Sequence, residues 1–262
     1  MEAATDVIGR AWSALHAVYR HEPNGASTSQ IARDCGLPRP TTHRLLTALL
    51  EHGVVDRTTA GAWTLGPELF ILGSVAARRY EVPPAVVATL QALSDQTGES
   101  AFYSVRRGDE SVCLVCVEGS FPLRSHVLHQ GIRFPLGVAS AGLAILAFLP
   151  ESESTAYLES VDLAHDYGEA HGEASLRARL ATARRLGYAV NPGLIVKGSI
   201  GIAAAVLDPD GRPVGAVSLT GVEHRFSPQR RPELGRGLVR AAHDVSQAIF
   251  GPGSRAFGRE VR

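Results

Sequence analysis

The sequence is poor in several kinds of residue, and each shortage excludes a class of protein. Its 262 residues include 3 cysteines, too few for a disulfide framework, so we expect a reducing compartment, the cytoplasm. No run approaches the roughly 18 apolar residues that a transmembrane helix requires, and the start "MEAATDVIGRAW" is unlike a signal peptide. The formal net charge is zero, so any attraction to phosphate must come from a local patch.

What the sequence does contain is a recognisable pair of helices near its start. The segment "TSQIARDCGLPRPTTHRLLTALLEHGVVDR" begins at Thr28 and follows an amphipathic pattern over 7–19. Ser27 and Gln30 fit a capping box for a short helix, which Gly36 ends in a tight turn. Because proline is tolerated only in a first helical turn, the next helix is predicted to start near Arg39. "VVDRTTAGAWTL" then predicts a β-hairpin, and the whole predicts a winged helix-turn-helix domain over residues 1–66.

The second of these helices has an exposed face suited to DNA. Burying Thr42, Leu45 and Leu49 leaves arginines on the other side, with no acidic residue between Asp34 and Glu51. In a helix-turn-helix, the start of the second helix reaches base edges and phosphates. The predicted DNA-binding residues are Ser29, Arg39, Pro40, Thr41, Thr42, His43, Arg44 and Thr47, with Arg57, Thr58 and Thr59 at the hairpin tip. The alternative is a helical hairpin that packs against another protein.

The rest of the chain has the pattern of a separate α+β domain. A linker helix is expected over residues 67–82, an α+β domain over 83–250 and a frayed tail over 251–262. Two strands are predicted around Gly108-Asp109, and a hairpin of two apolar strands around Asp210-Gly211. Helices are predicted for "ASAGLAILAFLP", stopped by Pro150, for 176–186 and for 228–250.

Nearly the whole chain, from about Val7 to Ile249, resembles the IclR family of bacterial transcriptional regulators. The resemblance is carried by "IARDCGLPRPTTHRLLTALLEHGVV", "WTLGPELFILG", "GIRFPLGVASAGLAILAFLP", "RLGYAVNPGLIVKGSIGIAAAVLDPDGRPVGAVSLTG" and "FSP", in matching order and spacing. It implies a winged helix-turn-helix joined by a helix to a GAF-like effector-binding domain. It also implies homodimers, or dimers of dimers, on palindromic double-stranded operators. Family members act as repressors, activators or both.

The resemblance also places an effector site in the second domain. "GVASAG", from Gly137 to Gly142, precedes an apolar helix whose first N–H groups, at Ser140 and Ala141, can bind a carboxylate. The alternative is that these small residues only let helix and sheet approach closely. We expect Leu136, Ile200 and Ile202 to form apolar walls, Asn191, Ser218 and Thr220 to be polar anchors, and Gly201 to lie in the cup.

Two departures from the family pattern concern the expected ligand. Members that bind small keto or hydroxy acids often carry acidic residues after "GYAV" and a cysteine in the next strand. Here those places hold Asn191-Pro192-Gly193 and Gly201. We therefore predict a cup enlarged for a flatter effector, an organic and probably aromatic acid.

Other chemistries were weighed and not favoured. Cys113 and Cys116 spell C-x-x-C, but a three-residue spacing in a regular strand puts them on opposite faces. The spacings of His126, His129, His165, Asp166, His171 and Glu173 fit no standard metal site. Ser140 within "ASAG" could serve a hydrolase, yet no base or oxyanion hole is nominated. We therefore predict no cofactor, no metal and no catalytic residue.

Overall fold

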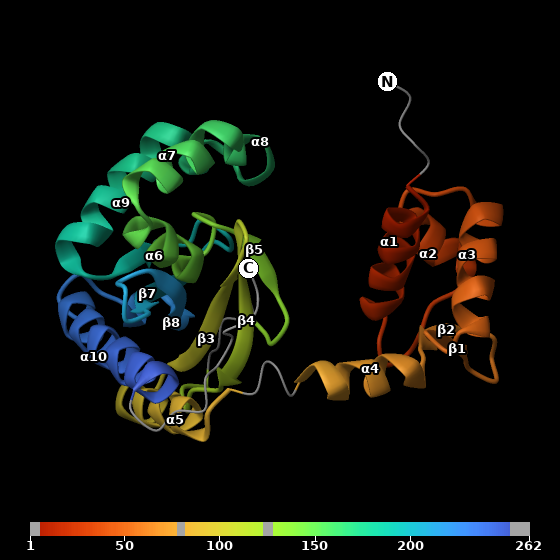
Figure 1. The fold of residues 1–262 in the computed structure, drawn as a ribbon, viewed down its shortest axis with the longest axis horizontal. Helices are drawn as coiled ribbons and strands as arrows, with labels where there is room; N and C mark the ends of the chain where they lie inside the picture. Colours follow the sequence, from red (N-terminus) through yellow and green to blue (C-terminus); the bar gives the residue numbers. More distant parts are fainter. Residues whose placement is uncertain (1–5, 78–81, 123–127, 252–262) are drawn as a thin grey trace. The chain divides into compact units, whose positions relative to one another are not determined.

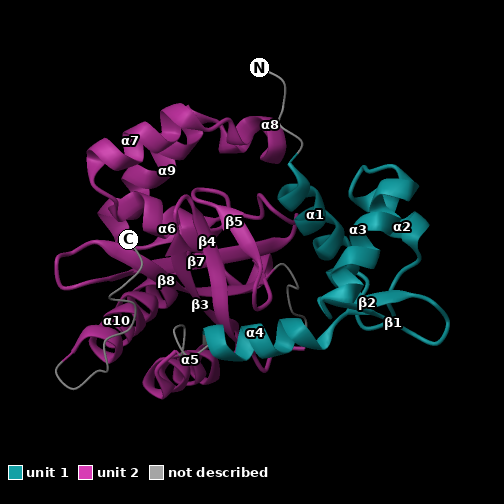
Figure 2. Cartoon of the chain, turned by 45° about the vertical axis from the view of Figure 1, so that its right-hand side comes forward, with its two compact units in different colours: residues 1–81 teal, residues 82–262 magenta. Residues whose placement is uncertain are grey.

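The structure is a computed structural model that describes residues 6–77, 82–122 and 128–251. The chain divides into two compact units, Met1–Glu81 and Val82–Arg262 (Figure 2). Apart from Gly251, the predicted tail lies outside the described residues, as does the end of the predicted linker helix.

The first unit is three helices, a short hairpin and a fourth helix. Its elements are α1 (Val7–Tyr19), α2 (Thr28–Asp34), α3 (Arg39–Glu51), β1 (Val55–Arg57), β2 (Trp63–Leu65) and α4 (Pro67–Ala77). The predicted capping box is confirmed, because Ser27 accepts from the backbone of Gln30 and the Gln30 side chain accepts from the backbone of Ser27. Gly36 has a φ of 64°, the left-handed conformation that ends α2 where a Cβ would be penalised.

The helices of this unit pack around one tryptophan and one leucine. Trp63 and Leu46 are fully buried with Ile31 and small residues of α1. The Trp63 indole N–H donates to Thr28 Oγ1 at 2.9 Å, which joins β2 to the start of α2. Leu46 is buried where we expected Leu45 and Leu49, which are only half-buried. This small rotation of α3 fixes which residues face outward.

The second unit is built on one six-stranded antiparallel sheet in the order β5-β4-β3-β8-β7-β6. Its strands are β3 (Ser100–Arg107), β4 (Glu110–Val117), β5 (Arg133–Pro135), β6 (Ala189–Asn191), β7 (Ser199–Leu207) and β8 (Pro213–Val222). Both predicted hairpins are confirmed, as β3–β4 and β7–β8. The strands β5 and β6 were not predicted, since three residues are too few for an alternating pattern.

Helices cover both faces of this sheet (Figure 1). They are α5 (Pro84–Thr97), α6 (Ser140–Phe148), α7 (Glu151–Ser160), α8 (Leu163–Tyr167), α9 (Glu173–Leu186) and α10 (Arg231–Phe250), with short 3₁₀ turns at Glu169–His171 and Glu223–Arg225. The helices α5 and α10 share one core with the sheet, whereas α6, α7 and α9 share the other. Since side chains alternate along β7, Ile200 and Ile202 enter the α5–α10 core, while Gly201 and Ala203 face α6.

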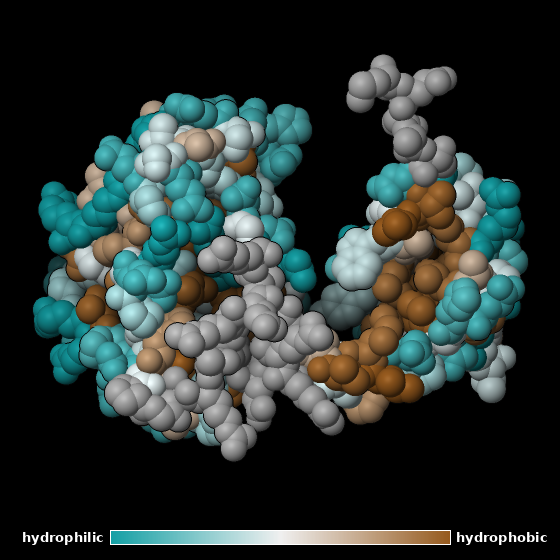
Figure 3. Space-filling view, in the orientation of Figure 1, coloured by the Kyte–Doolittle hydropathy of each residue, from teal (hydrophilic) through white to brown (hydrophobic). Residues whose placement is uncertain are grey.

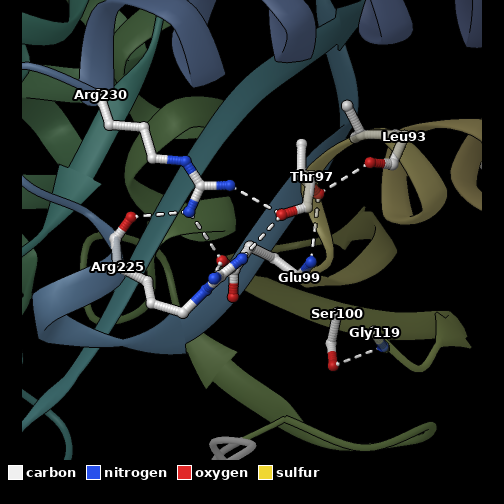
Figure 4. A network of polar contacts seen from close by, with 7 residues as sticks. All are labelled: Leu93, Thr97, Glu99, Ser100, Gly119, Arg225 and Arg230. Atoms are coloured by element: carbon white, nitrogen blue, oxygen red, sulfur yellow. Dashed lines mark hydrogen bonds and ion pairs between the residues drawn. The ribbon is translucent and has the colours of Figure 1, made fainter. Parts of the chain in front are cut away.

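A buried carboxylate joins the start of the sheet to the start of α10 (Figure 4). Glu99 is 2% exposed and its Oε1 accepts from Arg225 at 2.6 Å and from Arg230 at 2.9 Å. Both arginines also donate to the carbonyl oxygen of Thr97, at the end of α5. A charge buried this deeply requires such partners, so the network is a structural clamp between α5, β3 and α10.

We expect Glu99→Gln to destabilise the protein, because two arginines lose their counter-charge in a partly buried site. The loss should be about 2–3 kcal/mol, below that of a fully buried pair, because the arginine side chains are 25% and 29% exposed. Urea denaturation followed by circular dichroism measures it. Glu173→Gln, which removes an exposed pair with Arg177, is the control and should cost less than about 1 kcal/mol. Equal losses in the two variants would contradict the clamp.

Candidate DNA-contacting surface and effector pocket

The outward face of α3 carries the predicted basic residues. Arg39, Pro40, His43 and Arg44 are exposed, whereas Thr41 and Thr47 are half-buried. Pro40 lies in the first helical turn, where no intrahelical hydrogen bond is lost. The positive end of the helix dipole therefore lies beside two guanidinium groups, an arrangement that favours phosphate.

Neighbouring residues of α2 extend this surface. Arg39 Nε donates to Ser29 Oγ at 3.2 Å, so the predicted Ser29 holds an arginine of α3. The two lie on an open hollow of about 560 Å³ whose rim also includes Arg33. Sequence reasoning missed Arg33, although its exposed position on α2, one helical turn after Ser29, was a usable signal.

Thr42 does not belong to the DNA-contacting surface, which corrects our prediction. Its side chain is fully buried and its hydroxyl donates to the Pro38 carbonyl at 3.2 Å. The Thr42 backbone N–H donates to the same carbonyl oxygen. Neither group is free for phosphate, because Thr42 shares the inward side of α3 with Leu46, one turn away.

In the wing, the predicted residues have unequal positions. Arg57 ends β1, and its guanidinium donates to the Gly61 carbonyl at 3.0 Å and lies 4.8 Å from the Trp63 ring centroid. Thr58 accepts from the Ala62 N–H at 3.1 Å. These two residues therefore shape the turn, and Thr59 is exposed beyond them.

The second unit contains a small cavity at the start of α6. Its volume is about 20 Å³, room for about one water molecule. Four predicted effector residues line it: Ser140, Asn191, Gly201 and Thr220. Three of them form one row across the sheet, since Gly201 pairs with Asn191 on β6 and with Thr220 on β8. Unpredicted lining residues are Leu128, Ala139, Gly193, Ile195, Val196 and Ser199, several of which sit in a loop that has no periodic pattern to read.

The other predicted effector residues lie elsewhere. Ile200 and Ile202 point to the opposite face of the sheet, because they are one strand position away from Gly201. Leu136 and Ala141 are buried in the core under α6. Ser218 shares the α6 face with Thr220 but lies one repeat further along β8 and does not line the cavity.

Two hydroxyl groups near the cavity lack a hydrogen-bond partner within the described part of the chain. They are Thr220 Oγ1 and Ser218 Oγ, both buried. Buried polar groups are normally paired, because leaving one unpaired costs about 1–3 kcal/mol. The α6 N-cap, Ala139, offers no side-chain acceptor to the first N–H groups. Together these groups present unmet donors to a small anion.

Asn191 is held by the protein itself. Its amide nitrogen donates to the Val138 carbonyl at 2.6 Å, and its Oδ1 accepts from the Leu194 N–H at 3.0 Å. These two bonds fix the loop after β6 against the segment before α6. Asn191 thus braces the cavity wall, with less left over for a ligand than we predicted.

The C-x-x-C pair is a further correction. A β-bulge in the β3–β4 ladder pairs Cys113 with Ser104 and Cys116 with Phe102. Since Ser104 and Phe102 lie two residues apart on β3, both cysteines share one face, not opposite ones. Burial raises the pKa of Cys113 to about 12, and burial and Glu118 raise that of Cys116. Raised thiol pKa values disfavour the thiolate that metal binding needs.

The histidine set does not converge either. His165 pairs with Asp166 at 2.7 Å on the surface, whereas His171 is buried and bonded to the Tyr167 carbonyl. Among the residues that the structure describes, no three potential ligands gather around a common point. His126 lies outside them.

Known proteins match this chain in both units. Residues 8–59 match the IclR helix-turn-helix domain, and residues 75–247 match the model described as bacterial transcriptional regulator IclR C-terminal. The chain belongs to the IclR family. It is a transcriptional regulator with a DNA-binding helix-turn-helix and a C-terminal effector domain, and not an enzyme, which answers the hydrolase alternative for Ser140.

Individual relatives extend over nearly the whole chain. The transcriptional repressor IclR of Escherichia coli is 28% identical, covering 88% of this chain and 85% of its own. The regulator KipR of Bacillus subtilis is 25% identical over 90% of this chain and 94% of its own. The crystal structure of Thermotoga maritima IclR superposes with a TM-score of 0.71 at 26% identity, covering 95% and 100% of the two chains. An IclR homologue of Microbacterium hydrocarbonoxydans, solved with 4-hydroxybenzoate, has the same fold (TM-score 0.70, 22% identity, 92% and 99% covered). Within the described ranges, no helix is long and apolar enough to cross a membrane.

Proposed function

We propose that this regulator binds a palindromic operator as a dimer and that an aromatic carboxylic acid in its C-terminal unit changes operator affinity. Residues 1–66 would bind DNA in the cytoplasm, 67–82 would link, and 83–250 would hold the effector. Repression is the favoured direction, since the E. coli relative is named a repressor. The observation that carries the proposal is the exposed basic start of α3.

The DNA-binding part rests on the surface around α3. We assign base or phosphate contacts to Arg39, Pro40, Thr41, His43 and Arg44, with Thr47, Ser29 and the wing as flanking positions. Exposed guanidinium groups can bind guanine edges or phosphates in two directions. Arg33 adds a further cation beside Arg39. A protein neutral overall can still bind DNA when its positive charges gather on one surface.

The dimer rests on an apolar face of the first unit (Figure 3). Residues of α1 and α4 on this face are large, apolar and exposed: Ile8 (84%), Trp12 (58%), Phe70 (79%), Leu72 (55%) and Val75 (63%). A contiguous patch of this kind on a soluble domain marks an interaction site. We assign it to the same helices of a second copy, because two recognition helices on one palindrome require a two-fold axis.

The effector part rests on the unpaired hydroxyls beside the start of α6. A carboxylate there would accept from the first N–H groups of α6 and from Thr220, both otherwise unpaired. The ring would displace the loop 193–198, whose ends, Gly193 and Gly198, have φ of 78° and 85° and whose Val196 is half exposed. Aromatic acids are favoured because no acidic side chain lines the cavity and the relative of known fold binds 4-hydroxybenzoate.

We expect Arg44→Ala to weaken binding to a short mixed-sequence DNA duplex and to lower the slope of log affinity against log salt by about one, as loss of one phosphate contact does. Fluorescence anisotropy over a salt series measures both. Arg240→Ala, which removes an exposed arginine of α10, is the matched control and should bind like the parent. Unchanged binding by Arg44→Ala would contradict the assignment of α3.

We expect Phe70→Asp to shift the protein toward monomer, because it places a charge in the apolar face of α4. Sedimentation velocity over a concentration series measures the association. Val239→Asp changes an exposed valine of α10 in the other unit (42% exposed) and should leave it unchanged. A parent protein that is monomeric at every concentration would refute the dimer.

We expect 4-hydroxybenzoate and benzoate to raise the melting temperature, since a ligand that binds only the folded state stabilises it. Thr220→Val should weaken binding about three- to tenfold, the effect of one lost hydrogen bond, whereas Thr220→Ser should retain it. Differential scanning fluorimetry with glyoxylate and pyruvate in parallel supplies the comparison. Stabilisation by those two acids but by no aromatic one would exclude the aromatic effector.

A further inference from the structure

The closest approach between α6 and the sheet lies at Gly201. A Cβ built on Gly201 would stand 2.7 Å from Ser140 Oγ and 3.2 Å from Ser140 Cβ. Non-bonded atoms do not approach to 2.7 Å in this way, so a side chain at 201 and the hydroxymethyl group of Ser140 compete for one space. Thr220 Oγ1 lies 3.7 Å from the same point, so this space borders the unpaired hydroxyl.

This geometry corrects our expectation about the size of the cup. We predicted that glycine at 201 enlarges it. Ser140 instead fills the volume that the missing side chain leaves, and the remaining cavity of about 20 Å³ has room for about one water molecule. The loss of a side chain on β7 is therefore compensated from α6.

We propose that Ser140 and Gly201 act as a pair that determines which acid the pocket accepts. The inference rests on the proposed function and names the residues that restrict its ligand. Ser140 covers Gly201 from above and leaves a narrow gap beside the first N–H groups of α6. A flat carboxylate can enter such a gap with its edge toward Ser140 and Thr220. A tetrahedral sulfonate has a third oxygen that would meet the Gly201 backbone or Ser140.

The pair also explains why glycine is needed at 201 on an extended strand. Gly201 is not one of the glycines with positive φ, so its backbone conformation is open to any residue. Its requirement is the close approach of Ser140. The restriction therefore depends on what stands at 140, and it should disappear when the side chain there is removed.

The test is a double-mutant cycle of Gly201→Ala, Ser140→Gly and both together, in the full-length protein. Calorimetric titration with 4-hydroxybenzoate and with 4-hydroxybenzenesulfonate gives affinities, and thermal denaturation without ligand gives stability. Gly237→Ala on α10, where a Cβ meets only Leu93 at 3.8 Å, is the control. We expect the parent to bind the carboxylate at least tenfold more tightly than the sulfonate.

We expect Gly201→Ala to lower carboxylate affinity at least tenfold in the parent background but less than threefold in the Ser140→Gly background. The melting temperature should fall with Gly201→Ala and recover in the double variant. Equal effects of Gly201→Ala in both backgrounds overturn the pairing. Coupling in melting temperature without coupling in affinity, or equal binding of the sulfonate, overturns the specificity role. A parent that binds glyoxylate but no aromatic acid overturns the proposed effector instead, and the two failures are thereby distinguished.

Discussion

The structure of the second unit depends on how closely α6 can lie on the sheet. The contact is made by small residues on both sides, with Gly201, Ala203 and Ala216 on the strands and Ala141 and Ala144 on the helix. Close packing of this kind leaves no space for an extra methyl group. It brings the unpaired N–H groups at the start of α6 within reach of the β7–β8 hairpin, and so it creates the pocket. The same constraint keeps the pocket small until a ligand moves the loop beside it.

The two units use polar groups differently. In the second unit, the carboxylate of Glu99 is satisfied by two arginines, and the amide of Asn191 is bonded on both sides. These groups hold elements together and are not available to a ligand. Thr220 and Ser218 are buried without partners, which is where binding energy can be gained. On α3 the polar groups are exposed, so their binding energy comes from phosphate charge and is sensitive to salt.

A link between the units requires a conformational equilibrium that both ligands influence. An acid in the pocket can change operator affinity only as far as it binds two arrangements of the dimer with different affinity. The elements positioned for this are α4, whose apolar face we assign to the dimer, and α5, which the Glu99 clamp fixes to β3 and α10. A ligand that moves the loop 193–198 acts on the same sheet that carries this clamp.

The sequence by itself determined the elements with strong local signals. The capping box at Ser27, the left-handed Gly36, the two long hairpins and the helical periods of α1 and α3 all follow from short-range chemistry. Family membership followed from motif order and spacing. Only the tertiary structure decided which side of each element faces inward. It buried Thr42 by a rotation of α3, turned Ile200 and Ile202 to the other face of the sheet, and put Cys113 and Cys116 on one face through a bulge. It also showed Ser140 filling the place left by Gly201. The reason is physical: a local pattern gives the period of an element, whereas its register and its closest neighbours depend on packing between residues far apart in the chain.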